Sequence, residues 1–322
     1  MKAVVQERYG EPAEVLEIRD VEQPAPAADQ VLVRVAAASI NIGDCFVIRG
    51  APKVMRPIFG LRGPRRPIPG TDIAGTVESV GSDLAGVKAG DEIIGWCNGA
   101  FAEYAVVAGD AFAPKPSGLS WEHAAAIGVS AQTALQALRD QLKVQPGQTV
   151  LITGASGGVG TFAVQIAKAL GAEVTGVCST RNVEMVRAIG ADHVIDYIVE
   201  DFTTGAERYD LILDNVGAHS PSATRRVLAP GGKLLSNGAP VGGWFGGLDN
   251  VIKAFVGSLV DKRQARPFVS TNDKADLATL TEMAVAGTIT PVIDQTFTLD
   301  QGVAAVAHAA EGHARGKTVI TM

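Results

Sequence analysis

The sequence predicts an α/β protein with two domains, one built on a compact β-barrel and the other on a doubly wound parallel sheet. The chain has 322 residues, which is more than one ordinary hydrophobic core accommodates. Valine-rich segments punctuated by glycines fill roughly the first 115 residues. From about Pro114 strand and helix patterns alternate, and after about residue 265 the pattern changes again.

The barrel-like domain is expected from short β-branched segments in the first part of the chain. VLVRVAAASI (31–40), IAGTVESVG (73–81) and FAEYAVV (101–107) alternate in the manner of strands. Glycines between such strands favour a closed β architecture. The proline-rich, basic segment RPIFGLRGPRRPIPG (56–70) is expected to be a surface loop.

The parallel sheet is expected from strands and helices that alternate along the middle of the chain. The expected strands are TVLIT (149–153), EVTGVC (173–178), HVID (193–196), YDLILD (209–214) and GKLLSN (232–237). The expected helices are 121–142 in two pieces, 159–171 and 181–190. Strand, helix and strand in series predict parallel strands joined by right-handed crossovers.

The last part of the chain lacks this alternation. It contains a helical stretch at 273–287, a strand-like segment at 295–299, another helix and a closing strand at 317–322. Nothing in it repeats the pattern of the middle region.

Composition excludes several classes of function. The net charge is -6 and no basic stripe is present, so neither nucleic acid nor an anionic membrane surface is an expected partner. No apolar run is long enough to span a membrane, and the N-terminus does not resemble a secretory signal. The three cysteines are far apart and form no disulfide framework, so the expected compartment is the cytoplasm.

A glycine-rich loop follows the first predicted strand of the parallel sheet. Gly154, Gly157 and Gly160 lie between that strand and a long helix, in the order that a dinucleotide-binding unit requires. Glycines let the backbone approach a pyrophosphate, and the helix N-terminus favours its negative charge. The cofactor-binding residues expected in this loop are Gly154, Ser156, Gly157, Gly158, Val159 and Gly160.

The end of the second strand predicts which dinucleotide is bound. NAD sites place an acidic residue there to bind the ribose 2′-hydroxyl. This chain instead has Ser179, Thr180 and Arg181 directly after Cys178. Two hydroxyls and a cation suit a 2′-phosphate, so the expected cofactor is NADPH. The alternative for Arg181 is a solvent-facing residue at the start of a helix.

Several motifs in one order resemble the medium-chain dehydrogenase/reductase superfamily, in its zinc-independent quinone oxidoreductase-like branch. The motifs are NIGDCFVIRG (41–50), PIPGTDIAGTVESVG (67–81), GASGGVG (154–160), GADHVIDY (190–197), LDNVG (213–217) and RGKTVI (315–320). The resemblance implies a GroES-like catalytic domain formed by residues 1–122 and 266–322, with a Rossmann domain at 123–265. It also implies a homodimer.

The resemblance assigns further cofactor contacts. It places Tyr197 near the adenosine phosphate, Asn215 near the nicotinamide ribose, and Asn237 with Gly238 under the nicotinamide. Thr133 matches a position beside the cofactor and Lys317 a basic residue near the cleft. For each of them the alternative is a structural turn or cap residue.

Zinc is not expected. The catalytic zinc ligands of the superfamily's alcohol dehydrogenases correspond to Asn41, Thr71 and Val129, which do not form a zinc-binding set. Cys45 lies four residues beyond the first of these positions and is expected to be an ordinary buried residue.

The predicted catalytic segment contains Asn41, Asp44 and Phe46. Phe46 stands where many relatives have a tyrosine and cannot donate a proton, whereas the Asn41 amide can donate a hydrogen bond to a carbonyl oxygen. Asp44 either polarises water or caps a turn. Trp244 and Phe245, in the loop 241–250, either cover the substrate or pack within an inter-domain loop.

The expected reaction is hydride transfer from NADPH to a quinone or an α,β-unsaturated carbonyl. Conjugated acceptors need little electrophilic help, and two domains can align donor and acceptor. One alternative is an enoyl-thioester reductase, for which RGPRR (62–66) would supply a basic patch. Another is a non-catalytic NADPH-binding protein.

Overall fold

The computed structural model describes residues 1–237, 269–313 and 315–322, which form two compact units. Unit 1 comprises Met1–Gln132, Asn272–Gly287 and Pro291–Met322, and unit 2 comprises Thr133–Thr271 with Thr288–Thr290. The sequence predicts boundaries after residues 122 and 265, and the chain passes between the two units after Gln132, Thr271, Gly287 and Thr290. Both ends of the chain therefore belong to unit 1.

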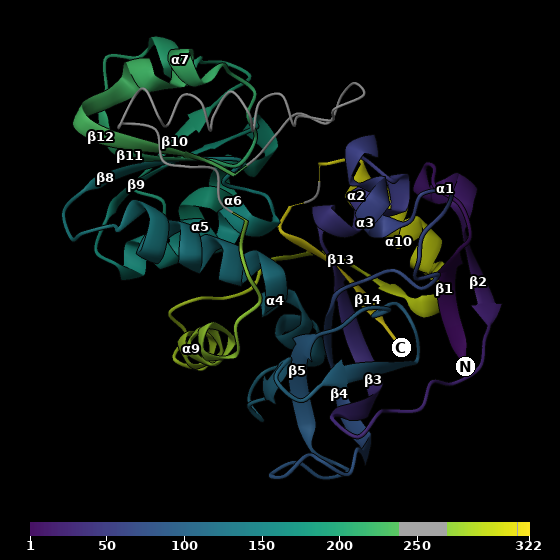
Figure 1. Cartoon of the computed structure of the whole chain (residues 1–322). Coiled ribbons are helices and arrows are strands. Elements are labelled where there is room, and N and C mark those ends of the chain that lie inside the picture. The colour runs from purple at the N-terminus through teal and green to yellow at the C-terminus, as the bar shows by residue number, and fades with distance from the viewer. Residues whose placement is uncertain (238–268, 314) are drawn as a thin grey trace. The chain divides into compact units, whose positions relative to one another are not determined.

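Unit 1 is built on a two-stranded and a seven-stranded sheet. Its strands are β1 (Lys2–Gln6), β2 (Leu16–Asp20), β3 (Gln30–Ile40), β4 (Asp72–Val80), β5 (Glu92–Trp96), β6 (Tyr104–Ala108), β7 (Phe112–Pro114), β13 (Ile293–Thr298) and β14 (Lys317–Thr321). The larger sheet has the order β13-β14-β3-β4-β5-β7, and β6 also pairs with β3. The antiparallel pair β14–β3 joins the C-terminal strand to the N-terminal region (Figure 1).

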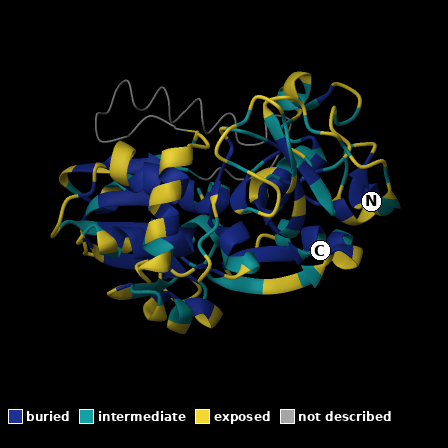
Figure 2. Cartoon of the chain, turned by 90° about the horizontal axis from the view of Figure 1, so that it is seen from below, coloured by how far each residue is buried: buried dark blue, intermediate teal, exposed yellow. Residues whose placement is uncertain are grey.

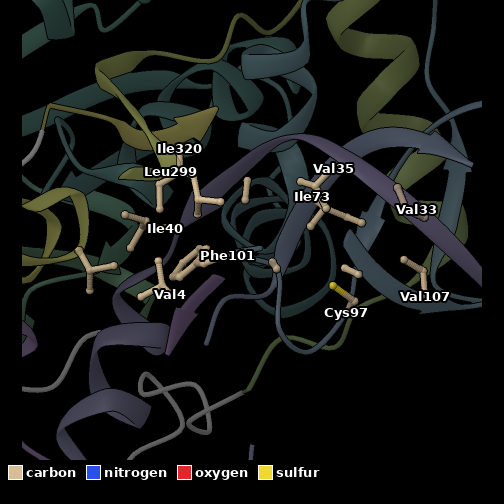
Figure 3. Packing of buried hydrophobic residues seen from close by; sticks show 14 of the residues in the cluster. Val4, Val33, Val35, Ile40, Ile73, Cys97, Phe101, Val107, Leu299 and Ile320 are labelled. Carbon is tan, nitrogen blue, oxygen red and sulfur yellow. The ribbon is translucent and has the colours of Figure 1, made fainter. Parts of the chain in front are cut away.

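The core of unit 1 lies on the inner faces of these strands. β3 contributes Val31, Val33 and Val35 to one hydrophobic cluster, as the period of two in its sequence requires. Figure 3 shows Phe101 beside Val4 within this cluster. Cys45 is fully buried in the same cluster, which confirms its prediction as a packing residue.

Short helices complete unit 1. They are α1 (Pro12–Val15), α2 (Ile42–Arg49), η1 (Lys53–Met55), α3 (Arg56–Phe59), the first part of α4 (Trp121–Gln136), α9 (Lys274–Val285), η6 (Leu299–Gln301) and α10 (Gly302–Ala310). The expected surface loop at 56–70 thus begins with one helical turn, α3. Pro57 lies in the first turn of α3, where its fixed φ favours helix and no amide hydrogen is needed.

The described residues of unit 2 form a five-stranded parallel sheet with the order β10-β9-β8-β11-β12. Its strands are β8 (Thr149–Thr153), β9 (Glu173–Cys178), β10 (His193–Asp196), β11 (Tyr209–Asp214) and β12 (Leu228–Ser236). Its helical elements are η2 (Ala137–Leu142), α5 (Gly158–Ala169), η3 (Thr180–Asn182), α6 (Val183–Ala188), η4 (Phe202–Thr204), α7 (Pro221–Thr224) and η5 (Arg225–Val227). Helices α5 and α6 cover one face of the sheet and α7 lies over the other (Figure 1).

The strands of unit 2 are mostly buried, whereas exposed residues lie on the surrounding helices and loops (Figure 2). The expected strands at 149–153, 173–178, 193–196 and 209–214 have the observed bounds. β8, β9 and β11 are largely buried, as in a parallel sheet covered on both faces, whereas the edge strand β10 is only partly buried. The expected Rossmann architecture is confirmed, and the structure places its first strand, β8, in the middle of the described strand order.

Candidate functional site

The carboxyl edge of the unit 2 sheet gathers most of the predicted cofactor residues. The parallel register aligns the ends of the five strands, because Asp214 pairs with both Thr153 and Ser236, and Asp196 pairs with Cys178. The residues that follow these ends are Gly154, Ser179, Tyr197, Asn215 and Asn237. The fold therefore brings these five positions, spread over 84 residues of sequence (237 − 153), to one edge, where open α/β sheets bind ligands.

The glycine loop forms a tight turn between β8 and α5. Gly154 has a φ of 61°, in the left-handed region that favours glycine. A Cβ at Gly160 would lie 2.0 Å from the Gly154 carbonyl oxygen, so the helix can approach the loop only with glycine there. Gly157 is the extended N-cap of α5 and contributes no side chain to its first turn. This geometry fits a pyrophosphate over Ser156, Gly158 and Val159.

The end of β9 carries hydroxyls and a cation. Thr180 and Arg181 are exposed in η3, and residues 178–182 include no acidic residue. Tyr197 lies at the neighbouring strand end, since its amide donates to the Cys178 carbonyl oxygen at 3.0 Å, and its side chain is 54% exposed. Two hydroxyls, one cation and no acidic side chain therefore stand at this strand end.

Asn182 is a residue of this edge that the sequence analysis missed. Its buried Nδ2 donates to Ser156 Oγ at 3.0 Å and to Ser179 Oγ at 3.2 Å, which ties the glycine loop to the end of β9. Its Oδ1 is buried without a hydrogen-bond partner among the described residues. The available signal was that Asn182 directly follows Ser179, Thr180 and Arg181, which the sequence assigns to the cofactor.

A chain of side-chain amides links the ends of β8, β11 and β12. Asn237 Nδ2 donates to Asn215 Oδ1 at 2.9 Å, and Asn215 Nδ2 donates to the Thr153 carbonyl oxygen at 3.1 Å. Buried Asp214 supports the turn by accepting from Thr153 Oγ1 at 2.6 Å and from the Gly217 amide at 2.9 Å. These bonds fix the orientation of both asparagines.

The remaining cofactor predictions lie elsewhere. Thr133 is buried in unit 2, with its hydroxyl 2.7 Å from Ser270 Oγ. Gly238 and the loop 241–250 with Trp244 and Phe245 lie outside the described residues. Lys317 belongs to unit 1.

Unit 1 contains a buried polar network around the predicted catalytic segment. Asn41 precedes α2, and its backbone amide donates to Asp44 Oδ2 at 2.8 Å. Asp44 Oδ1 accepts from the Thr71 hydroxyl at 2.8 Å. Asp44 is thus placed to cap the helix, which is one of its two predicted roles. Burial raises the pKa of Asp44 to about 6, against these hydrogen bonds.

Asp72 lies at the centre of this network and is fully buried. Its Oδ2 accepts from Asn41 Nδ2 at 2.8 Å, and its Oδ1 accepts from the Val129 amide at 3.0 Å. The Val129 amide follows a break in helix α4 at Gly128. A Cβ added to Gly128 would lie 2.2 Å from the Asp72 carboxylate. Burial raises the pKa of Asp72, and the nearby Lys317 opposes this shift.

Lys317 completes the network from the first position of β14. Its side chain is 1% exposed, and its Nζ lies 2.5 Å from Asn41 Oδ1 and 3.1 Å from Ser130 Oγ. Its distance to Asp72 Oδ2 is 3.9 Å. Burial lowers the pKa of Lys317, and Asp72 and Asp44 oppose this shift.

Asp72 and Ser130 are the functional candidates in unit 1 that the sequence analysis missed. A carboxylate directly before the predicted strand 73–81 was a visible signal, because charged residues are rarely buried unless paired. Ser130 carried no such signal. Phe46 is half-buried in α2, and nothing in the network requires a hydroxyl at that position.

The residues of this network do not fit a zinc ion. Asn41 and Val129 both bond to Asp72 at the centre of the network, whereas Thr71 bonds to Asp44. That centre holds the Lys317 amine, which would repel a divalent cation when protonated. Across residues 1–237, 269–313 and 315–322, no three histidine, cysteine or acidic side chains are grouped to bind a metal.

Comparison with known proteins identifies the family. Residues 27–117 match the alcohol dehydrogenase GroES-like domain, and residues 189–320 match the zinc-binding dehydrogenase family. The human mitochondrial NAD(P)H oxidoreductase RTN4IP1 is 35% identical over 91% of this chain and 82% of its own length. The chain belongs to the medium-chain dehydrogenase/reductase superfamily, in its quinone oxidoreductase-like branch.

Two further members of this superfamily support the assignment. The 2-methylene-furan-3-one reductase of Solanum lycopersicum is 31% identical over 99% of this chain and 79% of its own. The solved quinone oxidoreductase of Coxiella burnetii is 29% identical, with a TM-score of 0.88 over 100% of this chain and 99% of its own. None of the helices described here is long and apolar enough to cross a membrane.

Proposed function

We propose that the protein is an NADPH-dependent oxidoreductase that reduces quinones or α,β-unsaturated carbonyl compounds. The observation that carries the proposal is the carboxyl edge of the unit 2 sheet, where a glycine loop lies beside a strand end that bears Ser179, Thr180 and Arg181 and no acid. NADPH, when bound, supplies the hydride. The names of the human, tomato and Coxiella relatives are consistent with this chemistry.

We propose that three parts of the edge hold the cofactor. The glycine loop and the start of α5 bind the pyrophosphate through backbone amides. Ser179, Thr180 and Arg181 bind the 2′-phosphate, and Tyr197 lies beside the adenosine. Asn215 and Asn237, fixed by their mutual hydrogen bond, orient the nicotinamide end.

In unit 1 we propose that Asn41 binds the acceptor. One Nδ2 hydrogen is held by Asp72, and the other has no acceptor among the residues that the structure describes. This second hydrogen can stabilise negative charge on a carbonyl oxygen. A conjugated acceptor spreads that charge over several atoms, so water can supply the proton and Phe46 need not be a tyrosine. An isolated ketone would need a stronger electrophile.

The test is NADPH consumption with quinones, enones, enals, saturated ketones and acyl thioesters. Quinones or enones should be reduced and cyclohexanone should not. Asn41→Ala should lower the rate with an enone more than it weakens NADPH binding, whereas Phe46→Tyr should retain activity. Efficient turnover of saturated ketones with inert enones would reject the proposal, and turnover of thioesters alone would favour the enoyl reductase.

Titration with both dinucleotides tests the cofactor. NADPH should bind more tightly than NADH. Arg181→Ala should weaken NADPH by about 1–3 kcal/mol, the range for a hydrogen bond to a charged group, and leave NADH unchanged. Arg187→Ala is the matched control, because Arg187 is an exposed arginine of the next helix that pairs with Glu184. Equal binding of the two dinucleotides would contradict NADPH specificity.

Two further parts of the proposal concern the setting of the enzyme. We propose a cytoplasmic location, supported by three buried, unpaired cysteines, and cell fractionation tests it. We also propose a homodimer, with β12 as the pairing edge because it ends the described strand order on one side. Sedimentation as a monomer at micromolar concentration would reject it.

A further inference from the structure

A buried cation and a buried carboxylate hold the Asn41 side chain from opposite ends. Its Oδ1 accepts from Lys317 Nζ at 2.5 Å and from Ser130 Oγ at 3.1 Å. Its Nδ2 donates to Asp72 Oδ2 at 2.8 Å. A flipped amide would turn NH₂ toward the ammonium and oxygen toward the carboxylate, so only one orientation is compatible with both charges.

The same contacts polarise the amide. An ammonium at the oxygen and a carboxylate at one amide hydrogen both favour the charge-separated form of the amide, and hydrogen bonds in such a chain strengthen one another. All three side chains are at most 8% exposed, so water screens these charges little. The ammonium thereby makes the second Nδ2 hydrogen a better donor than that of an ordinary asparagine.

We propose that Lys317 is a positioning residue of the enzyme, whose ammonium orients and polarises Asn41 so that the amide can stabilise charge on the acceptor's carbonyl oxygen. This inference rests on the proposed function. It gives Lys317 a role different from the cofactor contact that the sequence resemblance implies. Lys317 acts through Asn41 and supplies a fixed positive charge in a network that does not fit a metal ion.

The inference is tested with one charge-removing variant, a charge-balanced variant and a control. Lys317→Met removes the ammonium and keeps most of the side-chain volume. Because it leaves Asp72 unpaired and can destabilise the fold, Lys317→Met combined with Asp72→Asn removes both charges. Lys115→Met is the control, since the Lys115 side chain is 5% exposed in the same unit and pairs with Glu92 at 3.0 Å.

The first measurement is independent of turnover. In protein labelled with ¹⁵N-asparagine, the side-chain amide signal of Asn41, assigned with Asn41→Ala, should be shifted downfield from ordinary asparagines. It should move toward their range in the variants that lack the Lys317 charge and stay in place in Lys115→Met. In ¹⁵N-lysine protein, Lys317 should be an ammonium at neutral pH. The inference would be overturned if the Lys317 side chain were a neutral amine. It would also be overturned if the chemical shift of the Asn41 amide were the same with and without the Lys317 charge.

The second measurement separates positioning from cofactor binding. With an enone, kcat should fall about tenfold or more in the charge-balanced variant, while the Kd for NADPH changes by no more than about twofold. Unchanged kcat would overturn the inference, as would a loss confined to NADPH affinity, which would make Lys317 a cofactor ligand. If no acceptor is reduced even by the wild type, the proposed function fails, and the amide signal still decides whether Lys317 polarises Asn41.

Discussion

The carboxyl edge of the parallel sheet and the buried network around Asp72 use polar residues in opposite ways. At the sheet edge, Thr180, Arg181 and Tyr197 have exposed side chains, and the proposed function gives them and the glycine loop a role in cofactor binding. In the network, Asp72 and Lys317 are at most 1% exposed and bond mainly to other protein groups. Changes at the edge should therefore affect binding, and changes in the network should affect stability first.

Loss of the central carboxylate should have the largest effect on stability. Asp72→Ala leaves the Lys317 ammonium without its nearest carboxylate and removes the acceptor of the Val129 amide. The free energy of unfolding should fall by about 3–5 kcal/mol, as when one partner of a buried ion pair is removed. Urea denaturation measures this change.

The control for this prediction is a carboxylate of an exposed pair. Asp300 lies 2.9 Å from Lys2, and its side chain is 68% exposed. Asp300→Ala should leave the urea midpoint nearly unchanged, because water screens such pairs. If both variants lose the same amount of unfolding free energy, the buried Asp72 network stabilises the fold no more than an exposed ion pair does.

The pH dependence of stability should reveal the second buried carboxyl. Burial raises the pKa of Asp44 from 3.8 to about 6 in the folded protein, so the folded state favours the protonated form. Its contribution to stability is complete below pH 3.8 and is lost as the pH rises through about 6. In the Asp44→Asn variant the side chain at this position has no titratable group. The stability of this variant relative to wild type should therefore rise by about 3 kcal/mol between acidic and neutral pH.

Urea denaturation of both proteins at several pH values between about 4 and 7 measures this difference. A constant offset is expected in addition, since asparagine accepts fewer hydrogen bonds than a carboxylate from the Asn41 amide and Thr71. A difference that does not vary with pH would show that Asp44 titrates alike in the folded and unfolded states.

The sheet edge was largely predictable from the sequence, whereas the network was not. Gly154, Ser179, Tyr197 and Asn215 each follow a strand with a strong local pattern, and the parallel register alone brings them together. The network joins Asn41 to residues 31, 89 and 276 positions away. No local pattern specifies such pairings, because they depend on how β3, β4, α4 and β14 pack.

Lys317 shows most clearly why the network could not be predicted from local sequence patterns. The sequence shows a lysine at the start of a strand, which is ordinarily a solvated position. The pairing of β14 with β3 places Thr318 opposite Ile40, directly before Asn41, and so brings the lysine beside that amide. The division between the two units likewise follows no local pattern. Helix α4 spans residues 121–136 and contributes to both units, so composition does not change where the units divide.

Crowding the glycine loop should weaken binding and stability together. In Gly160→Ala the new Cβ would lie 2.0 Å from the Gly154 carbonyl oxygen and 2.8 Å from Ala155 Cα, so the loop must move. We expect a loss of about 1–3 kcal/mol in unfolding free energy and a loss of NADPH affinity of about tenfold or more. Gly118→Ala is the control, because nothing lies within 4 Å of its added Cβ. Unchanged NADPH affinity in Gly160→Ala would show that the glycine loop does not bind the cofactor.

Truncation of an exposed edge side chain should have the smallest effect on stability and the clearest effect on binding. Tyr197 is 54% exposed, and its tie to β9 is the backbone bond to the Cys178 carbonyl oxygen, which alanine retains. Tyr197→Ala should therefore change the free energy of unfolding by less than about 0.5 kcal/mol. If the ring packs beside the adenosine, NADPH should bind about three- to fivefold more weakly, the scale of one partly exposed aromatic contact. Val199→Ala, two residues further along and 82% exposed, should change neither quantity. If Tyr197→Ala lost as much stability as Asp72→Ala, the side chains of the sheet edge would stabilise the fold. The contrast between this edge and the buried network, whose polar groups bond to one another, would then not hold.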